Sequence, residues 1–336
     1  MEVEYAWYRD GVPLKQGRKS CLLFVNEPGR YHCVVKVNDN IKQSEGLIIE
    51  AEMPPVSADM TKHDEIVGEI DENHIEMKDV IGQGTFGTVH KGEWRGTEIA
   101  IKCITLPPEW QNDWQNIKEL QIWRKLRHPN LLLLMGYFKK QDSLWIVTPF
   151  ISGSNLEKLI FSTEPPFQLL DDAKPYILYQ VASGCHYLHE EQIIHQDLKP
   201  ANVLVEKRTY RTVICDFGVS VFTMTAVTKN TAHAGTMMYQ HKESLTGKRP
   251  QPYMDVYAIG CIIFELYTSK RVWSDIVNPG QLFAKIFSNE YPNTDGLKQH
   301  QKIKEIVDGC FKDPMERLSM QEILQKLNIL VDRQKY

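Results

Sequence analysis

The stretch HQDLKPANVLV, residues 195–205, has the residue types and spacing of a loop that transfers phosphoryl groups, with Asp197, Lys199 and Asn202 as its polar side chains. Phosphoryl transfer spreads negative charge over three oxygens, so a site for it must supply positive charge and alignment. Gln196 occupies the position where a loop of this kind usually carries arginine. Whether the chain performs this chemistry therefore has to be judged from the elements that would position the loop.

A glycine-rich stretch, IGQGTFGTV at residues 81–89, contains Gly82, Gly84 and Gly87 in the pattern GxGxxGxV. The pattern alone is weak, because dinucleotide-binding folds also use it and continue directly into a helix. Here β-branched residues, a turn at Arg95-Gly96 and a second extended segment follow instead. A strand–loop–strand unit predicts a lid over phosphates, in which glycines let backbone N–H groups come close.

Lys102 closes the second of these strands in the sequence IAIK. A lysine buried without a partner would cost several kcal/mol, so a carboxylate is expected nearby. The segment at residues 114–132 repeats apolar residues at helical spacing and offers Glu119, nine residues before His128. Two interpretations of Glu119 stay open at this point: it pairs with Lys102, or it is one of many solvated helix glutamates.

These motifs occur in the order and spacing that are typical of the eukaryotic protein kinase family, which the chain resembles over roughly residues 75–333. HQDLKPAN is similar to the family's HRDxKxxN, and CDFG supplies its DFG motif fourteen residues after Asn202. The resemblance implies an α+β, bilobal kinase fold with a β-rich N-lobe and a helical C-lobe. The domain would occupy residues 74–333, with the N-lobe at 74–148, the hinge at 148–152 and the C-lobe at 153–333.

The resemblance also implies ATP and Mg²⁺ as cofactors and a role for each polar residue of the loop. Asp216 and Asn202 would hold magnesium. Asp197 would orient the acceptor hydroxyl and accept its proton, and Lys199 would steady the γ-phosphate.

In the same family the strand lysine pairs with a helix glutamate, which favours pairing of Lys102 with Glu119. Thr148 would be the gatekeeper behind the adenine. Pro149 would open the hinge without an N–H group, so adenine would have to use other backbone groups. The residues expected around the nucleotide are Ile81, Gly82, Gly84, Gly87, Val89, Ala100, Lys102, Thr148, Phe150 and Leu204.

Several features look like those of serine/threonine kinases rather than tyrosine kinases. Lys199 and Pro200 follow the catalytic aspartate, and Thr236 stands where such kinases place a threonine that can bond the catalytic Asp and Lys. The stretches LLLLMGYF and IVTPF look most like the tyrosine-kinase-like group, near its Raf and mixed-lineage members. The resemblance therefore implies protein substrates with serine or threonine hydroxyls.

The chain departs from the family pattern at Gln196. The arginine that it replaces pairs in the family with a phosphorylated residue of the activation segment, so we expect activation to depend less on that contact. The segment still offers four threonines as possible phosphosites, although all four could be plain loop residues. They are Thr223, Thr225, Thr228 and Thr231.

A second departure lies at the end of that segment, where His241-Lys242-Glu243 replaces the family's Ala-Pro-Glu. Loss of the proline is expected to loosen the substrate-docking loop. Glu243 is expected to form a buried bridge with Arg317, and Asp255 to brace the backbone of the catalytic loop. Cys215 is either an inert packing residue or a reactive thiol beside the nucleotide.

Residues 1–50 read as short strands, among them SCLLFVN at residues 20–26. Trp7 and the later Tyr31-His32-Cys33 resemble the second half of an immunoglobulin-like domain, with its Tyr-x-Cys tyrosine corner. Such a domain takes about 100 residues, so the strands before Trp7 are missing. This short all-β segment is either a remnant of little stability or a small surface for a protein partner. Residues 51–73 are acidic, hold two prolines and predict a linker.

Composition narrows the other possibilities. The chain has 336 residues and a net charge of −4, so its overall electrostatics do not favour nucleic acid. Its longest apolar stretch, residues 258–267, is about half of the ~20 residues that a membrane span needs, and predicts a buried helix. No signal peptide is visible, and the seven cysteines are scattered without CxxC pairs. Reduced thiols and a cytoplasmic location are therefore expected.

Three functions remain in competition. The first is an active serine/threonine protein kinase in signalling, which is favoured because Lys102, Glu119, Asp197, Asn202 and Asp216 are all present. The second is a pseudokinase scaffold that binds nucleotide or partner proteins without useful turnover, which the departures from the family pattern favour. The third, a small-molecule kinase, is weakened because residues 216–243 resemble a peptide-docking region.

Overall fold

The computed structural model divides the chain into two compact units, residues 1–64 together with 332–336, and residues 65–331. Each unit is described by itself. The residues that the structure describes are 3–13, 29–37, 40–43, 47–49, 68–84, 87–106, 108, 118–216, 237–240, 242–246, 250–276 and 278–332.

The first unit contains an antiparallel sheet with the strand order β2-β1-β3-β4, in which β5 also pairs with β3. β1 and β2 form a tight hairpin, because Asp10 and Gly11 both have positive φ, 50° and 81°, as a type I′ turn requires. The strand expected at residues 20–26 lies outside the described residues. The strands are β1 (Val3–Arg9), β2 (Val12–Pro13), β3 (Gly29–Val37), β4 (Asn40–Gln43) and β5 (Leu47–Ile49).

The second unit begins with a five-stranded antiparallel sheet in the order β6-β7-β8-β10-β9. Its core is made of Ile99, Ile101, Phe138 and Val147, which the alternation of β-branched and aromatic residues buries on one face. The predicted strand–loop–strand unit is confirmed. The elements are β6 (Ile75–Gly84), β7 (Gly87–Trp94), β8 (Thr97–Thr105), β9 (Gly136–Lys140), β10 (Ser143–Pro149) and helix α1 (Lys118–Lys125).

Residues 68–73, which the sequence assigns to the acidic linker, lie instead against this sheet. Ile70 donates its N–H to the Tyr137 carbonyl at 2.9 Å, and its side chain packs on the sheet core. A short 3-10 helix, η1 (Glu72–His74), is capped by the Asp71 carboxylate, which accepts from the Asn73 N–H at 3.0 Å. Ile70 is the one apolar side chain from Gly68 to Asn73, and it holds this stretch against the sheet despite the acidic composition around it.

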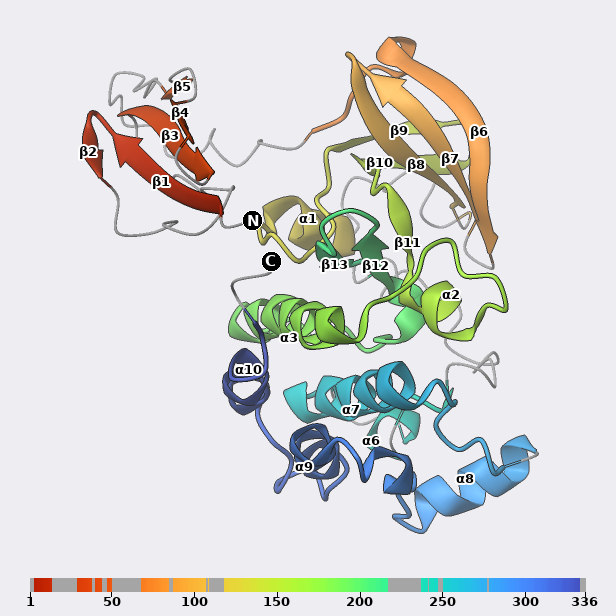
Figure 1. Ribbon diagram of the computed structural model, residues 1–336. Coiled ribbons are helices and arrows are strands. Elements are labelled where there is room, and N and C mark those ends of the chain that lie inside the picture. The colour runs from red at the N-terminus through yellow and green to blue at the C-terminus, as the bar shows by residue number, and fades with distance from the viewer. Residues whose placement is uncertain are drawn as a thin grey trace, which may run out of the picture. The chain divides into compact units, whose positions relative to one another are not determined.

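The rest of the second unit is mainly helical (Figure 1), as expected for a C-lobe. A short sheet of β11, β12 and β13 lies between the five-stranded sheet and the larger helices. The elements are β11 (Gly153–Asn155), α2 (Leu156–Phe161), η4 (Asp171–Ala173), α3 (Lys174–Glu190), η5 (Pro200–Asn202), β12 (Val203–Glu206), β13 (Thr212–Ile214), α6 (Lys242–Leu245), α7 (Pro252–Thr268), α8 (Pro279–Phe287), η6 (Asp295–Leu297), α9 (Gln301–Cys310) and α10 (Met320–Asn328).

Helix α7 is the centre of this helical part. Every residue from Met254 to Leu266 is buried, so the prediction of a buried core helix at residues 258–267 is confirmed. α7 packs against α3 on one side and against α9 on another (Figure 1). Among the described residues, no helix is both long and apolar enough to cross a membrane.

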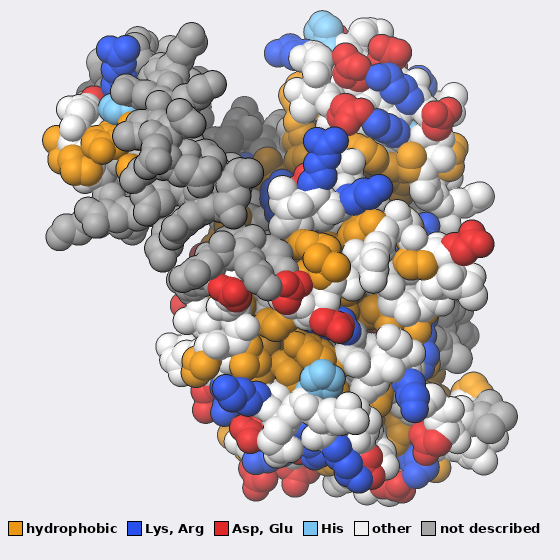
Figure 2. Space-filling model, viewed as in Figure 1, with side chains coloured by type: hydrophobic (Ala, Val, Ile, Leu, Met, Phe, Trp, Pro, Cys, Tyr) orange, Lys and Arg blue, Asp and Glu red, His pale blue; other side chains and the backbone are white. Residues whose placement is uncertain are grey.

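Charged side chains of both signs are interspersed over the visible face of the second unit (Figure 2). On the five-stranded sheet they form exposed pairs, such as Lys78 with Glu93 at 2.9 Å and Lys140 with Glu72 at 3.1 Å. Exposed pairs of this kind add little stability, since water screens both charges. The sheet is therefore held by its apolar core rather than by its surface charges.

Candidate active site

The loop before β12 brings three of the predicted polar side chains into direct contact. Lys199 Nζ donates to both carboxylate oxygens of Asp197, at 2.9 and 2.8 Å. Asn202 Nδ2 donates to the Asp197 carbonyl at 2.8 Å and to its carboxylate Oδ2 at 3.0 Å. The short helix η5 makes this possible because its turn folds Asn202 back over Asp197. The loop therefore holds one carboxylate between an ammonium and an amide.

The end of β13 places Asp216 beside the strand lysine. Lys102 Nζ lies 2.6 Å from Asp216 Oδ1, with the two side chains 17% and 33% exposed. Val203 of β12 pairs with Ile214 of β13, and the Cys215 N–H donates to the Asn202 carbonyl at 2.9 Å. The hairpin thus brings Asp216 next to the loop that carries Asp197, although the two lie on different segments.

His195 connects the segment that carries Asp197 to the segment that carries Asp216. Its ring is fully buried, its Nδ1 accepts the Asp197 N–H at 3.2 Å, and its Nε2 lies 3.2 Å from the Cys215 carbonyl. Because Nδ1 accepts a hydrogen bond, the ring proton is assigned to Nε2, which donates to Cys215. The imidazole therefore fixes the backbone before Asp197 relative to the backbone before Asp216.

Asp255 of α7 braces the same loop, as predicted. Its Oδ2 accepts the His195 N–H and its Oδ1 accepts the Gln196 N–H, both at 2.9 Å. Gln196 has a φ of 66°, in the left-handed region that non-glycine residues rarely adopt. Such a conformation costs of order 1–3 kcal/mol and persists only where neighbouring contacts impose it. The two bonds to Asp255 supply that constraint.

The side chain of Gln196 lies apart from the carboxylates. Its Nε2 donates weakly to the Ile194 carbonyl at 3.5 Å. An amide carries no charge, so it cannot form the charge-assisted pair that an arginine makes with a phosphate. The four candidate threonine phosphosites, Thr236 and His241 lie outside the described residues.

The described residues of the glycine-rich stretch form the end of β6 and the start of β7. Gly82 pairs with Val89, and Gly84 pairs with Gly87 at the tip. Gly87 has a φ of 124°, and a Cβ at this position would overlap the backbone carbonyl of Cys103 on β8. A Cβ at Gly82 would only touch Val89 at 3.7 Å, an ordinary contact. Of these two glycines, Gly87 is the one that the backbone requires.

The remaining expected nucleotide contacts fall on the same sheet and on β12. Ile81 is 43% exposed on β6, and Val89 on β7 is half-buried. Ala100 on β8 pairs with Thr148 on β10, whose hydroxyl donates to the Ala100 carbonyl at 3.4 Å. Leu204 lies on β12 and is half-buried.

The connection between the two lobes shows why a proline is tolerated in the hinge. Pro149 pairs with Ile99, and the next residue, Phe150, donates its N–H to the Glu98 carbonyl at 3.2 Å. Antiparallel pairs alternate between hydrogen-bonded and non-hydrogen-bonded, so the Pro149–Ile99 pair is of the second kind. The sheet therefore loses no ladder bond at Pro149, whose carbonyl faces away from β8. Beyond the hinge, the Ser152 carbonyl accepts the Lys207 N–H at 3.0 Å.

Glu119 lies on α1, but its side chain is outside the described residues. Pairing of Lys102 with Glu119 therefore stays a prediction. Among the described side chains, Asp216 is a hydrogen-bond partner of Lys102.

Cys215 is a packing residue rather than an activated thiol. It is buried next to Asp216, and burial together with the nearby negative charge raises the pKa of its thiol well above the ordinary value. A thiol reacts as its thiolate, which these surroundings disfavour. The interpretation as a reactive thiol is therefore not supported.

Arg317 and Glu243 lie together in the interior, as predicted. Arg317 Nη2 is 4.0 Å from Glu243 Oε2, and both side chains are buried. This distance is longer than a hydrogen bond. Arg317 is held mainly by the carbonyls of Lys312 and Tyr253, which accept from its guanidinium at 2.9 and 3.0 Å.

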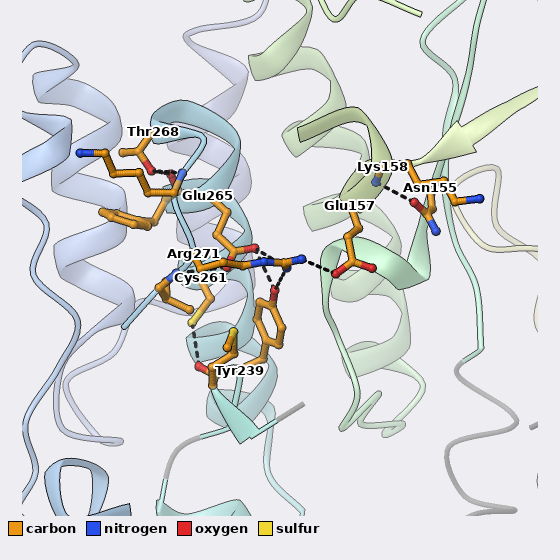
Figure 3. A network of polar contacts seen from close by, with 12 residues as sticks. Asn155, Glu157, Lys158, Tyr239, Cys261, Glu265, Thr268 and Arg271 are labelled. Atoms are coloured by element: carbon orange, nitrogen blue, oxygen red, sulfur yellow. Dashed lines mark hydrogen bonds and ion pairs between the residues drawn. The ribbon is translucent and has the colours of Figure 1, made fainter. Parts of the chain in front are cut away.

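A polar network that the sequence did not predict anchors the residues just before α6 (Figure 3). Tyr239 Oη donates to Glu265 Oε2 at 2.9 Å and accepts from Arg271 Nη1 at 2.8 Å. Arg271 Nη2 reaches Glu157 Oε1 on α2 at 2.6 Å, and the Val272 N–H donates to Glu265 Oε1 at 3.1 Å. The network ties the end of the activation segment to both α7 and α2.

Glu265 makes this network sensitive to pH. Its side chain is fully buried, and this burial raises the pKa of its carboxyl from 4.5 to about 7, while the hydrogen bonds from Tyr239 and Val272 and the charge of Arg271 act in the opposite direction. Glu157 and the Cys261 thiol are the other titratable groups near it. The folded state therefore holds the Glu265 proton more tightly than the unfolded state does.

We expect the free energy of unfolding to fall as pH rises from about 4.5 to 7, by an amount on the order of 3 kcal/mol that Glu265→Gln removes. Below this window the carboxyl is protonated in both states, and within it only the unfolded state releases the proton. Urea unfolding at pH 5 to 8 measures the effect, with Glu164→Gln, an exposed glutamate outside this network, as the matched control. Parallel pH profiles for the wild type and Glu265→Gln would rule the assignment out.

Comparison with known proteins agrees with this geometry. Residues 75–328 match the family model described as the protein kinase domain. The serine/threonine-protein kinase CTR1 of Arabidopsis thaliana is 32% identical over 262 residues, which cover 76% of this chain and 32% of CTR1. Mitogen-activated protein kinase kinase kinase 7 of Bos taurus is 31% identical over 270 residues, which cover 78% of this chain and 45% of that protein.

A third relative, the probable serine/threonine-protein kinase SIS8 of Arabidopsis thaliana, is 34% identical over 257 residues, covering 74% of this chain and 24% of SIS8. The matched region thus spans less than half the length of each of these three relatives. Their names agree with the predicted serine/threonine type of kinase domain. The chain belongs to the protein kinase family, and residues 75–328 are its protein kinase domain.

Proposed function

We propose that the chain transfers the γ-phosphoryl group of ATP to serine and threonine hydroxyls of proteins, with Mg²⁺ as cofactor. The observation that carries this proposal is the arrangement of two carboxylates with two lysines: Asp197 with Lys199, and Asp216 with Lys102. Positive charge and oxygen ligands lie side by side, which is what a triphosphate with a bound metal needs.

The residues present fit magnesium. Asn202 commits its amide nitrogen to Asp197, so its oxygen is the atom that can act as a ligand. Together with a carboxylate oxygen of Asp216, this gives the hard oxygen donors that Mg²⁺ prefers. When bound, magnesium offsets the charge of the phosphates and so lowers the cost of transfer.

The other residues act on the acceptor and the nucleotide. The oxygen of the substrate hydroxyl forms a bond to the γ-phosphorus, and Asp197 accepts the proton that this hydroxyl loses. The bond from that phosphorus to the bridging oxygen breaks, and ADP leaves. Lys199 and Lys102 supply positive charge to the phosphate oxygens, and Glu119 is proposed to hold Lys102 in position.

Adenine would lie between the sheet and β12. Ile81, Val89 and Ala100 would cover it from above and Leu204 from below, with Thr148 behind it. The Pro149 carbonyl would accept from the adenine amino group, and the Ile151 N–H would donate to the ring. A proline at this position removes a donor that adenine does not need and keeps the acceptor.

Gly87 gives a direct test of the lid. We expect Gly87→Ala to raise KM for ATP by about tenfold, equivalent to about 1.4 kcal/mol, because the new Cβ overlaps a carbonyl on β8 and displaces the loop. Gly82→Ala, within the same motif, is expected to change it by less than about threefold. Steady-state kinetics with varied ATP measure both. Equal effects of the two substitutions would contradict the role given to Gly87.

We further propose that the domain belongs to the tyrosine-kinase-like group, near Raf and mixed-lineage kinases. The stretches LLLLMGYF and IVTPF support this, and so does the likeness to CTR1 and to mitogen-activated protein kinase kinase kinase 7. The neutral Gln196 supports a catalytic loop whose order comes from Asp255 rather than from a phosphorylated residue. A signalling role in the cytoplasm follows from the same resemblance.

The N-terminal strands are proposed to be part of an immunoglobulin-like domain that binds a protein partner. In such domains strands C, F and G share one sheet, with Trp on C and Tyr-x-Cys on F. Here Trp7 lies on β1 directly opposite Cys33 on β3, and β4 follows β3 in the sheet. This order agrees with strands C, F and G. A kinase domain at residues 74–333 and a linker from residue 51 complete the proposed organisation.

Incubation with radiolabelled ATP, Mg²⁺ and a generic basic protein tests the main proposal. We expect label on serine and threonine in the wild type, and a loss of at least about 100-fold in Lys102→Met, because the substitution removes positive charge beside the triphosphate. Equal counts in both samples, together with measurable nucleotide binding, would favour the pseudokinase scaffold instead. Label on tyrosine alone would contradict the serine/threonine assignment.

A further inference from the structure

Beneath the catalytic loop, three metal-ligating side chains meet between helices α3 and α7. Cys185 and His189 stand four residues apart on α3, which puts them on one face of the helix, and Asp255 faces them from α7. Cys185 Sγ lies 3.5 Å from His189 Nε2 and 3.9 Å from Asp255 Oδ2, and the last two atoms are 2.9 Å apart. Cys185 and Asp255 are buried, and the His189 side chain is 8% exposed.

These separations match those around a tetrahedral zinc ion. Zinc binds thiolate sulfur at about 2.3 Å, imidazole nitrogen at about 2.0–2.1 Å and carboxylate oxygen at about 2.0–2.2 Å. Two ligand atoms at such distances in a tetrahedral site lie roughly 3.3–3.6 Å apart. The observed distance of 3.5 Å lies within that range, 3.9 Å lies above it and 2.9 Å below it, so small side-chain shifts would complete the site.

We propose that Cys185, His189 and Asp255 form a zinc site that ties α3 to α7 directly under the catalytic loop. Two donors four residues apart on a helix with a third from a facing element is an arrangement that zinc proteins use. A thiolate and a carboxylate balance the charge of Zn²⁺, so the loaded site is neutral, as a buried position requires. A mixed sulfur, nitrogen and oxygen set also selects zinc over Mg²⁺ or Ca²⁺, which take oxygen ligands.

Binding involves proton release and no redox change. The Cys185 thiol gives its proton to solvent as its sulfur binds the ion, and the His189 ring must present Nε2 without a proton. Burial and the Asp255 charge raise the pKa of the Cys185 thiol well above its ordinary value, so binding weakens as pH falls. Three protein ligands leave the fourth tetrahedral position to a water molecule.

The site would act on the catalytic loop through Asp255. The same carboxylate accepts the N–H groups of His195 and Gln196, so an ion that fixes its position also fixes the loop. The proposal is independent of the kinase reaction, because a scaffold without turnover could hold zinc in the same way. The experiment that tests the zinc site therefore measures metal binding and not kinase activity.

Cobalt titration of the full chain, after treatment with a chelator, tests the proposal. We expect the wild type to bind one Co²⁺ with a thiolate-to-cobalt charge-transfer absorption, which Zn²⁺ displaces, and zinc to raise Tm. Cys185→Ser should abolish that absorption and weaken zinc binding at least tenfold. Cys310→Ser is the matched control, since Cys310 is also a buried helix cysteine and should leave both unchanged.

Two outcomes would overturn the zinc site. One is a wild type without thiolate-to-cobalt absorption, a result that needs no variant. The other is absorption that persists in folded Cys185→Ser, which would place the thiolate ligand elsewhere. If Cys185→Ser does not fold, His189→Gln replaces it, because the amide keeps a polar group beside Asp255 while removing the imidazole ligand. An unchanged affinity for Co²⁺ in that variant counts equally against the proposal.

Discussion

Replacing Asp197 with asparagine is expected to lower kcat by about 10²–10⁴-fold and to leave KM for ATP within about threefold. Asparagine keeps the shape of the side chain and one oxygen for Lys199 and Asn202, which both bond this carboxylate. It cannot accept the proton of the substrate hydroxyl. The loss should therefore fall on the chemical step rather than on nucleotide binding. Steady-state kinetics with a serine peptide measure both constants.

Asp142→Asn is the control for this experiment. Asp142 is exposed in the turn between β9 and β10, so the same chemical change should leave kcat unaltered. A kcat for Asp197→Asn within tenfold of the wild type would remove Asp197 from the role of base. A large rise in KM for ATP with unchanged kcat would instead place the residue in nucleotide binding.

Asp255→Ala is expected to lower the free energy of unfolding by about 3–5 kcal/mol. The carboxylate is buried and accepts the N–H groups of His195 and Gln196 and a bond from His189. Alanine would leave the backbone N–H groups of His195 and Gln196 without these acceptors, and Gln196 has a positive φ that the bond to Asp255 helps to hold. Activity should fall with stability, because the same backbone carries Asp197. Thermal unfolding with a chelator present measures the change without any contribution from bound metal.

Asp308→Ala is the matched control. Asp308 also has two partners, Thr294 Oγ1 at 2.7 Å and Lys304 Nζ at 2.6 Å, but its side chain is 44% exposed. Water can replace both contacts, so the expected loss is below about 1 kcal/mol. Similar losses of Tm in the two variants would show that burial of Asp255 is not what makes it important.

Features set by local sequence were predictable. The glycine spacing with β-branched neighbours gave the β6–β7–β8 unit, and the apolar run at residues 258–267 gave the core of α7. In each case a single segment of about ten to twenty residues carries the whole pattern.

Features assembled from distant segments were not predictable from the residues alone, and the contacts of Asp255 with the catalytic loop and of Arg317 with Glu243 were expected only from the family resemblance. Arg271 bonds Glu157 across 114 positions, and no periodicity in either segment indicates the contact. Cys185, His189 and Asp255 likewise meet only because α3 packs on α7. The tolerance of Pro149 depends on which pairs of the β8–β10 ladder are hydrogen-bonded, a property of register that the sequence does not reveal.

The hydrogen bonds around the hinge have a consequence for opening and closing of the two lobes. Phe150 is bonded to the upper sheet through Glu98, and the carbonyls of Ile151 and Ser152 accept the N–H groups of Gly153 and Lys207 below the hinge. Proline fixes φ at residue 149, so that torsion cannot contribute to the motion. Rotation of one lobe relative to the other must therefore use the backbone torsions of Phe150 and Ile151, and a proline at residue 151 would restrict this motion as well as remove the N–H proposed to donate to adenine.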